Sequence, residues 1–259
     1  MDLDTARPAV ADAAARFTNL VSSVDPSLPL PDSEWTAGDM TAHVTIVARA
    51  LEGYLGGERE PVLDVADVPG SNARVLAERP ERDIGKLTDE LQDATGGFFR
   101  NSENATATDP TSWHGMDATV GAVYGIYLGE LLLHGRDVAR AAGRPWPISR
   151  SDATIIFACS AAVAHGFLDE EKVKDLSATY EVRLRGGPRL TFAFAGGALD
   201  VTPGPARRAD CRISADPLAV VLVVYGRTSQ WTQIARGKLM SFGRKPWLAL
   251  RFAGLFKSV

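Results

Sequence analysis

Three side chains of the sequence have the types and spacing needed to bind a metal ion. Glu130 and His134 are four residues apart, so on a helix their Cβ atoms lie about 5–6 Å apart on one face. His43 belongs to a separate apolar segment and supplies the third group. Two histidines and one carboxylate leave coordination positions open, which is typical of a catalytic metal site. The alternative is a buried, hydrogen-bonded His–Glu pair without a metal.

His43 needs a helix that points it inward. Thr36 and Asp39 have the spacing of a capping box, which predicts a helix start. Trp35, just before that start, is expected to pack onto Met40. The apolar residues that follow recur at three- and four-residue spacing: Met40, Val44, Val47, Leu51 and Leu55. Because His43 lies about 60° from the centre of this stripe, we predict that it faces the interior of a helical bundle.

Glu130 and His134 need a long helix, and residues 118–142 have the pattern of one. Gly143 follows as a C-terminal cap, and Pro145 lies just beyond it. Weaker patterns predict further helices at 9–22, 70–79, 83–100 and 151–168, with a loop over 109–115. The first part of the chain is therefore expected to be all-α.

Two further side chains are candidates for the same site. Asp137 comes three residues after His134 and could orient it, although a solvated acid at a helix end explains it equally well. His114, in the predicted loop, could line the mouth of the site, although a capping or exposed role is the simpler interpretation.

Near residue 178, the spacing of hydrophobic residues changes from the helical pattern to alternation with polar residues. Apolar and polar residues alternate in two runs: Tyr180, Val182 and Leu184, then Leu190, Phe192 and Phe194. With a short third strand at 199–201, they predict a three-stranded meander. A fourth strand fits 211–214, a helix opens at Asp216-Pro217, and another begins at Pro246. We therefore predict an all-α domain over 1–172 and a small α+β domain over 173–259.

Composition limits the class of protein. The chain of 259 residues is 45% hydrophobic, with a net charge of −4 and a pI near 5.6, which argues against a general nucleic-acid binder. No run of about 18 apolar residues predicts a transmembrane helix, and the N-terminus lacks the pattern of a signal peptide. We therefore expect a cytoplasmic protein. Cys159 and Cys211 show no metal-ligand spacing and are expected to be buried, unpaired thiols.

Charge is unevenly distributed along the chain. The first 216 residues contain 21 basic and 32 acidic side chains, a net charge of −11. The last 43 residues contain seven basic and no acidic side chains, a net charge of +7. Either the two domains have complementary surfaces, or the C-terminal half binds an anionic ligand.

Three runs of residues resemble the mycothiol-dependent maleylpyruvate isomerase family. They are the run from Trp35 to His43, the triplet Trp113-His114-Gly115, and the run from Glu130 to Gly143. The resemblance spans most of residues 9–170. It implies a DinB-like four-helix bundle in which His43, Glu130 and His134 bind a divalent metal, usually zinc.

The tail resembles the sterol-carrier-protein-like domain that is often fused to this bundle. The resemblance lies in residues 209–217, in Gly226-Arg227 and in residues 234–239. Carriers of that type hold lipids in an apolar tunnel, whereas in the fused proteins the domain can instead shape the active-site cleft. A lipid ligand in this domain therefore stays an open alternative.

The resemblance also implies a function. It indicates a divalent-metal-dependent enzyme that uses a low-molecular-weight thiol such as mycothiol, as an isomerase or a thiol S-transferase acting on a small substrate. A metal with an open position lowers the pKa of a bound thiol from about 8.5. Arg236 or Arg227 is the candidate to hold a substrate carboxylate, because the Arg fork matches that group. A lipid-binding protein with a structural or vestigial metal site and a regulatory protein with a relict site are the alternatives.

Overall fold

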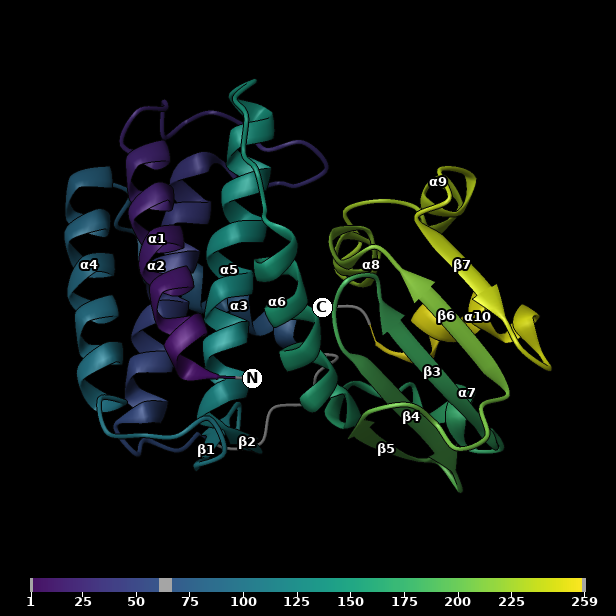
Figure 1. The fold of residues 1–259 in the computed structure, drawn as a ribbon. Coiled ribbons are helices and arrows are strands. Elements are labelled where there is room, and N and C mark those ends of the chain that lie inside the picture. Colours follow the sequence, from purple (N-terminus) through teal and green to yellow (C-terminus); the bar gives the residue numbers. More distant parts are fainter. Residues whose placement is uncertain (1, 61–66, 258–259) are drawn as a thin grey trace. The chain divides into compact units, whose positions relative to one another are not determined.

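The chain forms two compact units, Met1–Ile148 and Ser149–Val259, and each is described here by itself (Figure 1). The structure is a computed structural model that describes residues 2–60 and 67–257. The first unit is helical and the second is α+β, as the sequence predicts. Within the described residues, no helix is both long and apolar enough to cross a membrane.

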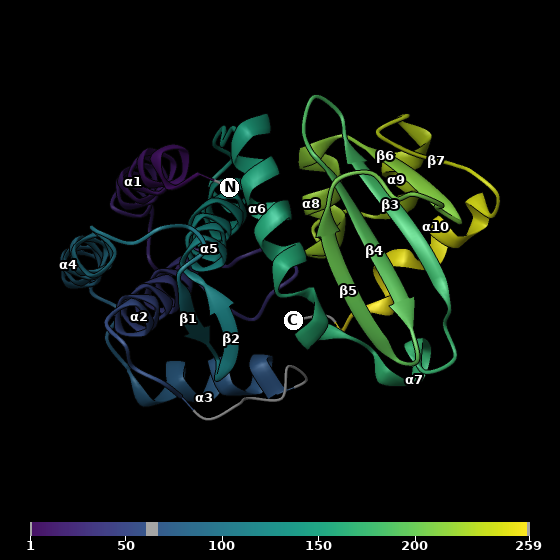
Figure 2. The same ribbon diagram turned by 60° about the horizontal axis from the view of Figure 1, so that its bottom comes forward.

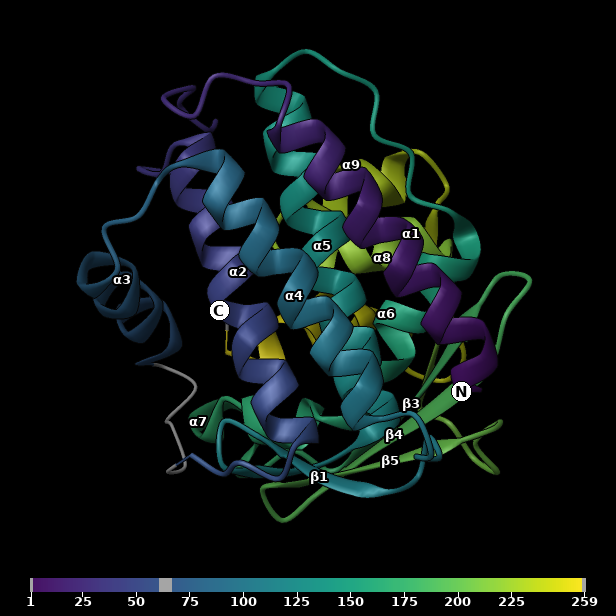
Figure 3. The ribbon, with the colours of Figure 1, turned by 90° about the vertical axis from the view of Figure 1, so that its left-hand side faces the viewer.

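The first unit is a bundle of four long helices. Helices α2 and α4 pack together, α5 packs against α1 and α2, and α1 also contacts α4 (Figure 3). The elements of this unit are α1 (Leu3–Val21), α2 (Ala37–Leu55), α3 (Val68–Glu78), α4 (Ile84–Asn101), β1 (Pro110–Trp113), β2 (Met116–Thr119) and α5 (Val120–Ala141).

Three helix predictions for this unit, 70–79, 83–100 and 118–142, are confirmed to within two residues. The predicted start of the first helix and the predicted loop are wrong. Helix α1 begins at Leu3 and not at residue 9, because Asp2 caps it and Pro8 is accommodated inside the helix. The predicted loop over 109–115 contains strand β1, which pairs antiparallel with β2.

The start of α2 is fixed by the predicted capping box. The Asp39 N–H donates to Thr36 Oγ1 at 3.2 Å, and the Thr36 N–H donates to Asp39 Oδ2 at 2.9 Å. Arg82 Nε also donates to Asp39 Oδ1 at 2.7 Å. His43 follows one turn after Asp39, so these contacts determine where its side chain enters the bundle.

Helix α5 is tied to α4 by two buried tyrosines. The Tyr127 hydroxyl lies 2.6 Å from Thr95 Oγ1, and the Tyr124 hydroxyl lies 2.8 Å from Ser102 Oγ. Both tyrosines are fully buried. These two hydrogen bonds fix the rotation of α5 about its axis, which decides where Glu130 points.

The second unit contains a five-stranded sheet in the order β5-β4-β3-β6-β7 (Figure 2). Its strands are β3 (Ala178–Leu184), β4 (Arg189–Ala195), β5 (Ala198–Pro203), β6 (Cys211–Ala215) and β7 (Leu239–Phe242). The remaining elements are α6 (Arg150–Ala162), η2 (Ala164–Phe167), α7 (Glu170–Val173), α8 (Pro217–Val224), α9 (Gln230–Ala235), η3 (Pro246–Leu248), α10 (Ala249–Phe252) and η4 (Ala253–Leu255).

The predicted meander β3-β4-β5 and the predicted fourth strand β6 are confirmed. Strand β6 pairs parallel with β3, whereas all other pairs in the sheet are antiparallel. One face of the sheet forms part of the core of the unit. There the ring centroid of Phe252 lies 5.0 Å from that of Tyr180 and 5.1 Å from that of Phe192. Strand β7 was not predicted.

The predicted domain boundary and the division between the compact units differ. The sequence predicts the boundary at 172/173, whereas the units divide between Ile148 and Ser149. The main difference is α6, which packs against α8 and η2 of the second unit. The boundary at 172/173 between two independently folding domains stays a proposal.

Candidate metal centre

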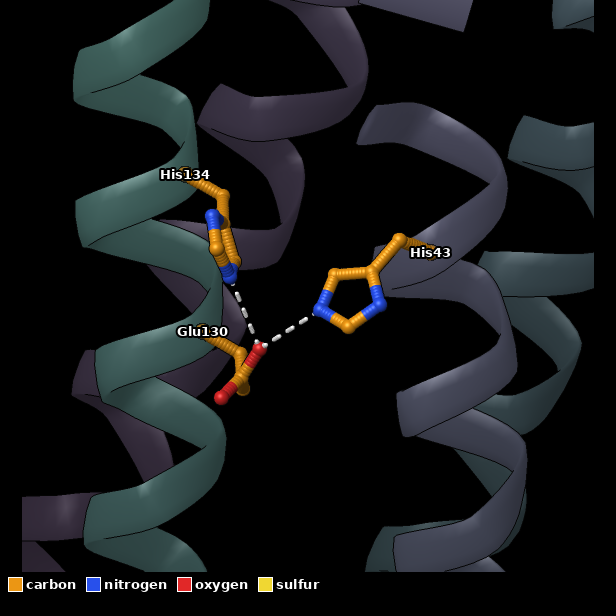
Figure 4. A group of neighbouring side chains, drawn as sticks. All are labelled: His43, Glu130 and His134. Carbon is orange, nitrogen blue, oxygen red and sulfur yellow. Dashed lines mark ion pairs between the residues drawn. The ribbon is translucent and has the colours of Figure 1, made fainter. Parts of the chain in front are cut away.

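Glu130 and His134 lie one turn apart on α5 and converge with His43 of α2 (Figure 4). His134 Nε2 lies 3.1 Å from Glu130 Oε2, and His43 Nε2 lies 3.4 Å from the same oxygen. The two imidazole rings meet edge to face, with centroids 5.0 Å apart. One ligand atom from each residue lies within 4.8 Å of the others, so the structure brings together the three side chains that the sequence singles out.

The geometry of this group fits a metal ion. At metal–ligand distances of about 2.0–2.1 Å, two ligands of a tetrahedral ion lie about 3.3 Å apart, which matches the distances to Glu130 Oε2. That oxygen is buried, and within the described residues it accepts no well-aligned hydrogen bond. A buried carboxylate oxygen without a donor is costly, and a cation between the three residues would satisfy it.

The electrostatics of the group also suit a divalent ion. Burial by itself raises the pKa of Glu130, but the interactions with His134 and His43 outweigh it and hold the pKa of the carboxyl well below its usual range. Burial lowers the pKa of His43, despite the opposing effect of Glu130. His43 is therefore neutral at neutral pH, with a lone pair available to bind a metal.

Three protein ligands leave coordination positions for a ligand from solution. Glu130 and His134 keep 24% and 16% of their side-chain surfaces exposed, whereas His43 keeps 7%. Glu130 and His134 are therefore more accessible to solvent than His43. Such a site can bind and polarise a small molecule, in contrast to a closed structural site.

Trp35 and Asp137 lie next to the two histidines of the group. Trp35 lies against His43, with ring centroids 5.0 Å apart. The sequence places Trp35 just before the capping box but does not predict its contact with His43. Asp137 Oδ2 lies 3.9 Å from His134 Nδ1, too far for a direct hydrogen bond. The role of Asp137 in orienting His134 stays a prediction.

His114 lies at the tip of the β1–β2 hairpin. Its φ of 49° and that of 74° at Gly115 place both turn residues in the left-handed region, as a two-residue hairpin turn requires. Its Nδ1 lies 3.6 Å from Glu60 Oε2. Burial lowers the pKa of His114, while the charges of Glu60 and Glu130 act in the opposite direction. The interaction with Glu130 indicates that the hairpin tip lies toward the candidate metal centre.

The remaining candidate residues lie in the second unit. Arg236 caps the C-terminal end of α9 and is exposed, and Arg227 donates to the Tyr225 carbonyl at 2.7 Å. Any part that either residue plays in binding a substrate stays a prediction. Cys159 and Cys211 are both buried, as expected, and neither forms a disulfide within the described residues.

The fold and the site define a class of protein. It is a helical bundle with a His-Glu-His group between two of its helices, followed along the chain by an α+β unit with a five-stranded sheet. The model of the family described as "Mycothiol maleylpyruvate isomerase N-terminal domain" matches residues 7–139, more than half of the chain. The chain belongs to this family. The model of the "SCP-2 sterol transfer family" matches residues 163–257.

Two solved structures support this fold assignment. Both are of the mycothiol-dependent maleylpyruvate isomerase, and one is a histidine-to-alanine mutant. The mutant is 13% identical to this chain with a TM-score of 0.56, and the other structure is 12% identical with a TM-score of 0.53. Each comparison covers 93% of both chains. At these identities the likeness shows the fold alone. A search of curated proteins gave no match.

Proposed function

We propose that this protein is a divalent-metal-dependent enzyme that uses a low-molecular-weight thiol, as an isomerase or a thiol S-transferase. The convergence of His43, Glu130 and His134 supports the proposal most strongly, together with a buried Glu130 oxygen that accepts no well-aligned hydrogen bond from the part of the chain that the structure describes. Membership of the mycothiol maleylpyruvate isomerase family supports mycothiol as the thiol.

The proposed metal is zinc, held by the three side chains. When bound there, it would supply a Lewis acid that favours the thiolate form of a thiol at neutral pH. Glu130 stays ionised and His43 stays neutral. Because an imidazole that binds a metal is neutral, the three ligands of a bound ion would carry one negative charge. That charge compensates part of the charge of a divalent ion and leaves the site cationic enough to attract a thiolate.

The surroundings of the site determine what else can enter it. Trp35 covers one side of His43 and excludes water there. The hairpin tip with His114 presents a polar side chain that can donate to or accept from a bound molecule. We expect a small substrate, with a carboxylate held by Arg236 if it is anionic. Cytoplasmic location is part of the same proposal.

A second candidate function is lipid binding by the C-terminal part of the chain. The match to the SCP-2 sterol transfer family over residues 163–257 favours it. In that case the metal would be structural or vestigial, and the bundle would act as a scaffold.

Thiol binding to the cobalt-loaded protein tests the proposal. Cobalt(II) replaces zinc in such sites, and a thiolate bound to it gives a strong charge-transfer absorption. We expect this absorption when mycothiol is added to the wild type at neutral pH, and also in His165→Ala, because His165 is exposed in η2. His134→Ala should lose it. Cobalt binding without any thiolate absorption in the wild type would overturn the thiol-dependent function and favour lipid binding.

A further inference from the structure

The large exposed hydrophobic side chains gather in one part of the sequence. Among the described residues, all of them lie between positions 224 and 250 in the second unit: Val224, Trp231, Ile234, Met240, Phe242, Trp247 and Leu250. Single exposed apolar residues scattered over a protein are ordinary, whereas a group of them marks a surface that binds something.

Four of these residues lie on two neighbouring helical segments. Trp231 and Ile234 are three residues apart on α9, and Trp247 and Leu250 are three residues apart on the consecutive segments η3 and α10. This spacing places each pair on one side of its segment. The Gln230 side chain donates to the Leu250 carbonyl at 3.3 Å, so the two segments are adjacent. We call these four side chains the tryptophan surface.

The tryptophan surface is held by well-packed neighbours. One residue on each segment is buried. Phe252 on α10 is 7% exposed and lies in the core beside the sheet, and Gln233 on α9 is 5% exposed. Trp231 and Trp247, in contrast, are 58% and 59% exposed. The segments are therefore anchored on one side while they present large apolar groups on the other.

Positive charge accompanies this apolar group. No acidic residue follows Asp216, and Lys238, Arg244 and Arg251 are all exposed on or beside the same segments. Tryptophan sits favourably at the boundary between lipid headgroups and acyl chains. Lysine and arginine near that boundary are attracted to anionic lipids.

We propose that the tryptophan surface binds the surface of an anionic lipid bilayer, so that the protein associates peripherally with a membrane. Ile234 and Leu250 suit the acyl region, and the basic side chains suit anionic headgroups. A second copy of the chain is a poorer occupant, because a symmetric contact would bring the same basic residues face to face. The proposal is independent of the metal and of the thiol.

Sedimentation with vesicles tests the proposal on the full-length protein. We expect the wild type to pellet at low salt with vesicles of equal parts phosphatidylglycerol and phosphatidylcholine, and not with vesicles of phosphatidylcholine alone. The double variant Trp231→Ser/Trp247→Ser should lose pelleting. The double variant Lys238→Glu/Arg251→Glu should partition at least about tenfold more weakly.

A matched control separates the surface from net charge. Lys172→Glu/Lys174→Glu changes the charge by the same amount at α7, where Lys174 lies beside the β4–β5 turn. This variant should bind like the wild type, and the circular dichroism of every variant should match the wild type. Absence of pelleting by the wild type would overturn the proposal. Dimerisation that Trp231→Ser/Trp247→Ser abolishes, without vesicle binding, would identify a second copy as the occupant and would also overturn it.

Discussion

His43 Nε2 lies 3.4 Å from Glu130 Oε2, although the two residues belong to different helices of the bundle, α2 and α5. The approach depends on the packing of α2 against α5. The capping box sets where α2 begins, and the bond from Tyr127 to Thr95 sets the rotation of α5. The candidate metal centre therefore depends on contacts outside its own three residues, and several of these can be tested.

Metal binding should stabilise the folded protein. A ligand that binds only the folded state raises the free energy of unfolding by about 2.7 kcal/mol at a free concentration of 100 times its Kd. We expect added zinc to raise the unfolding temperature of the wild type and of His165→Ala, and excess chelator to reverse the rise. His134→Ala should show no such shift. An equal shift in His134→Ala would mean that zinc binds elsewhere.

The capping box should stabilise α2 in a pH-dependent way. Burial raises the pKa of Asp39, but the bonds from the Thr36 N–H and from Arg82 outweigh it and lower the pKa below the ordinary value of 3.8. A carboxyl group with a lowered pKa in the folded state stabilises the protein above its unfolded pKa, and this contribution is lost as the pH falls through the folded pKa.

Urea unfolding of Asp39→Asn measures this contribution. We expect the variant to be less stable than the wild type by about 1 kcal/mol near neutral pH. The difference should shrink as the pH falls below about 4, provided that both proteins remain folded there. A difference that is independent of pH over this range would contradict the role given to the Asp39 charge.

Gly135 should be required for the packing of Trp146 against α5. A Cβ atom at Gly135 would lie 2.3 Å from Cζ2 of Trp146, whose Nε1 donates to the Leu132 carbonyl at 2.9 Å. We expect Gly135→Ala to displace the indole and to lower the free energy of unfolding by about 1–3 kcal/mol.

Gly70→Ala is the matched control for this substitution. Gly70 lies in α3, and the nearest atom to an added Cβ is Nη1 of Arg74 at 3.6 Å. The same change should therefore be neutral or stabilising by up to about 1 kcal/mol in urea unfolding. Equal effects of the two substitutions would contradict the steric argument at Gly135.

The parts of the fold that sequence predicts best are those with local signals. The Thr36–Asp39 pattern and the apolar stripe predict α2 and the inward orientation of His43, and alternation predicts β3 and β4. The i,i+4 spacing of Glu130 and His134 predicts one shared face, so the grouping with His43 follows once both helices face the same core. That the group holds a metal stays a prediction.

The parts that sequence does not predict depend on contacts between distant residues or lack local patterns. The β1–β2 hairpin has four-residue strands and a His-Gly turn in place of the usual Asn-Gly or Asp-Gly. Strand β7 is an edge strand whose Met240 and Phe242 are exposed, so apolar alternation there does not mark a buried face. The parallel pairing of β6 with β3 leaves no signal in either strand alone.

The metal content of protein purified without a metal-affinity tag tests the central claim most directly. We expect about one zinc or similar divalent ion per chain in the wild type and in His165→Ala, because the three convergent ligands make one site. His43→Ala should lose the ion while keeping the circular dichroism of the wild type. An ion retained in full by folded His43→Ala, or no ion in the wild type even after zinc is added, would contradict the assignment of His43, Glu130 and His134 as a metal centre.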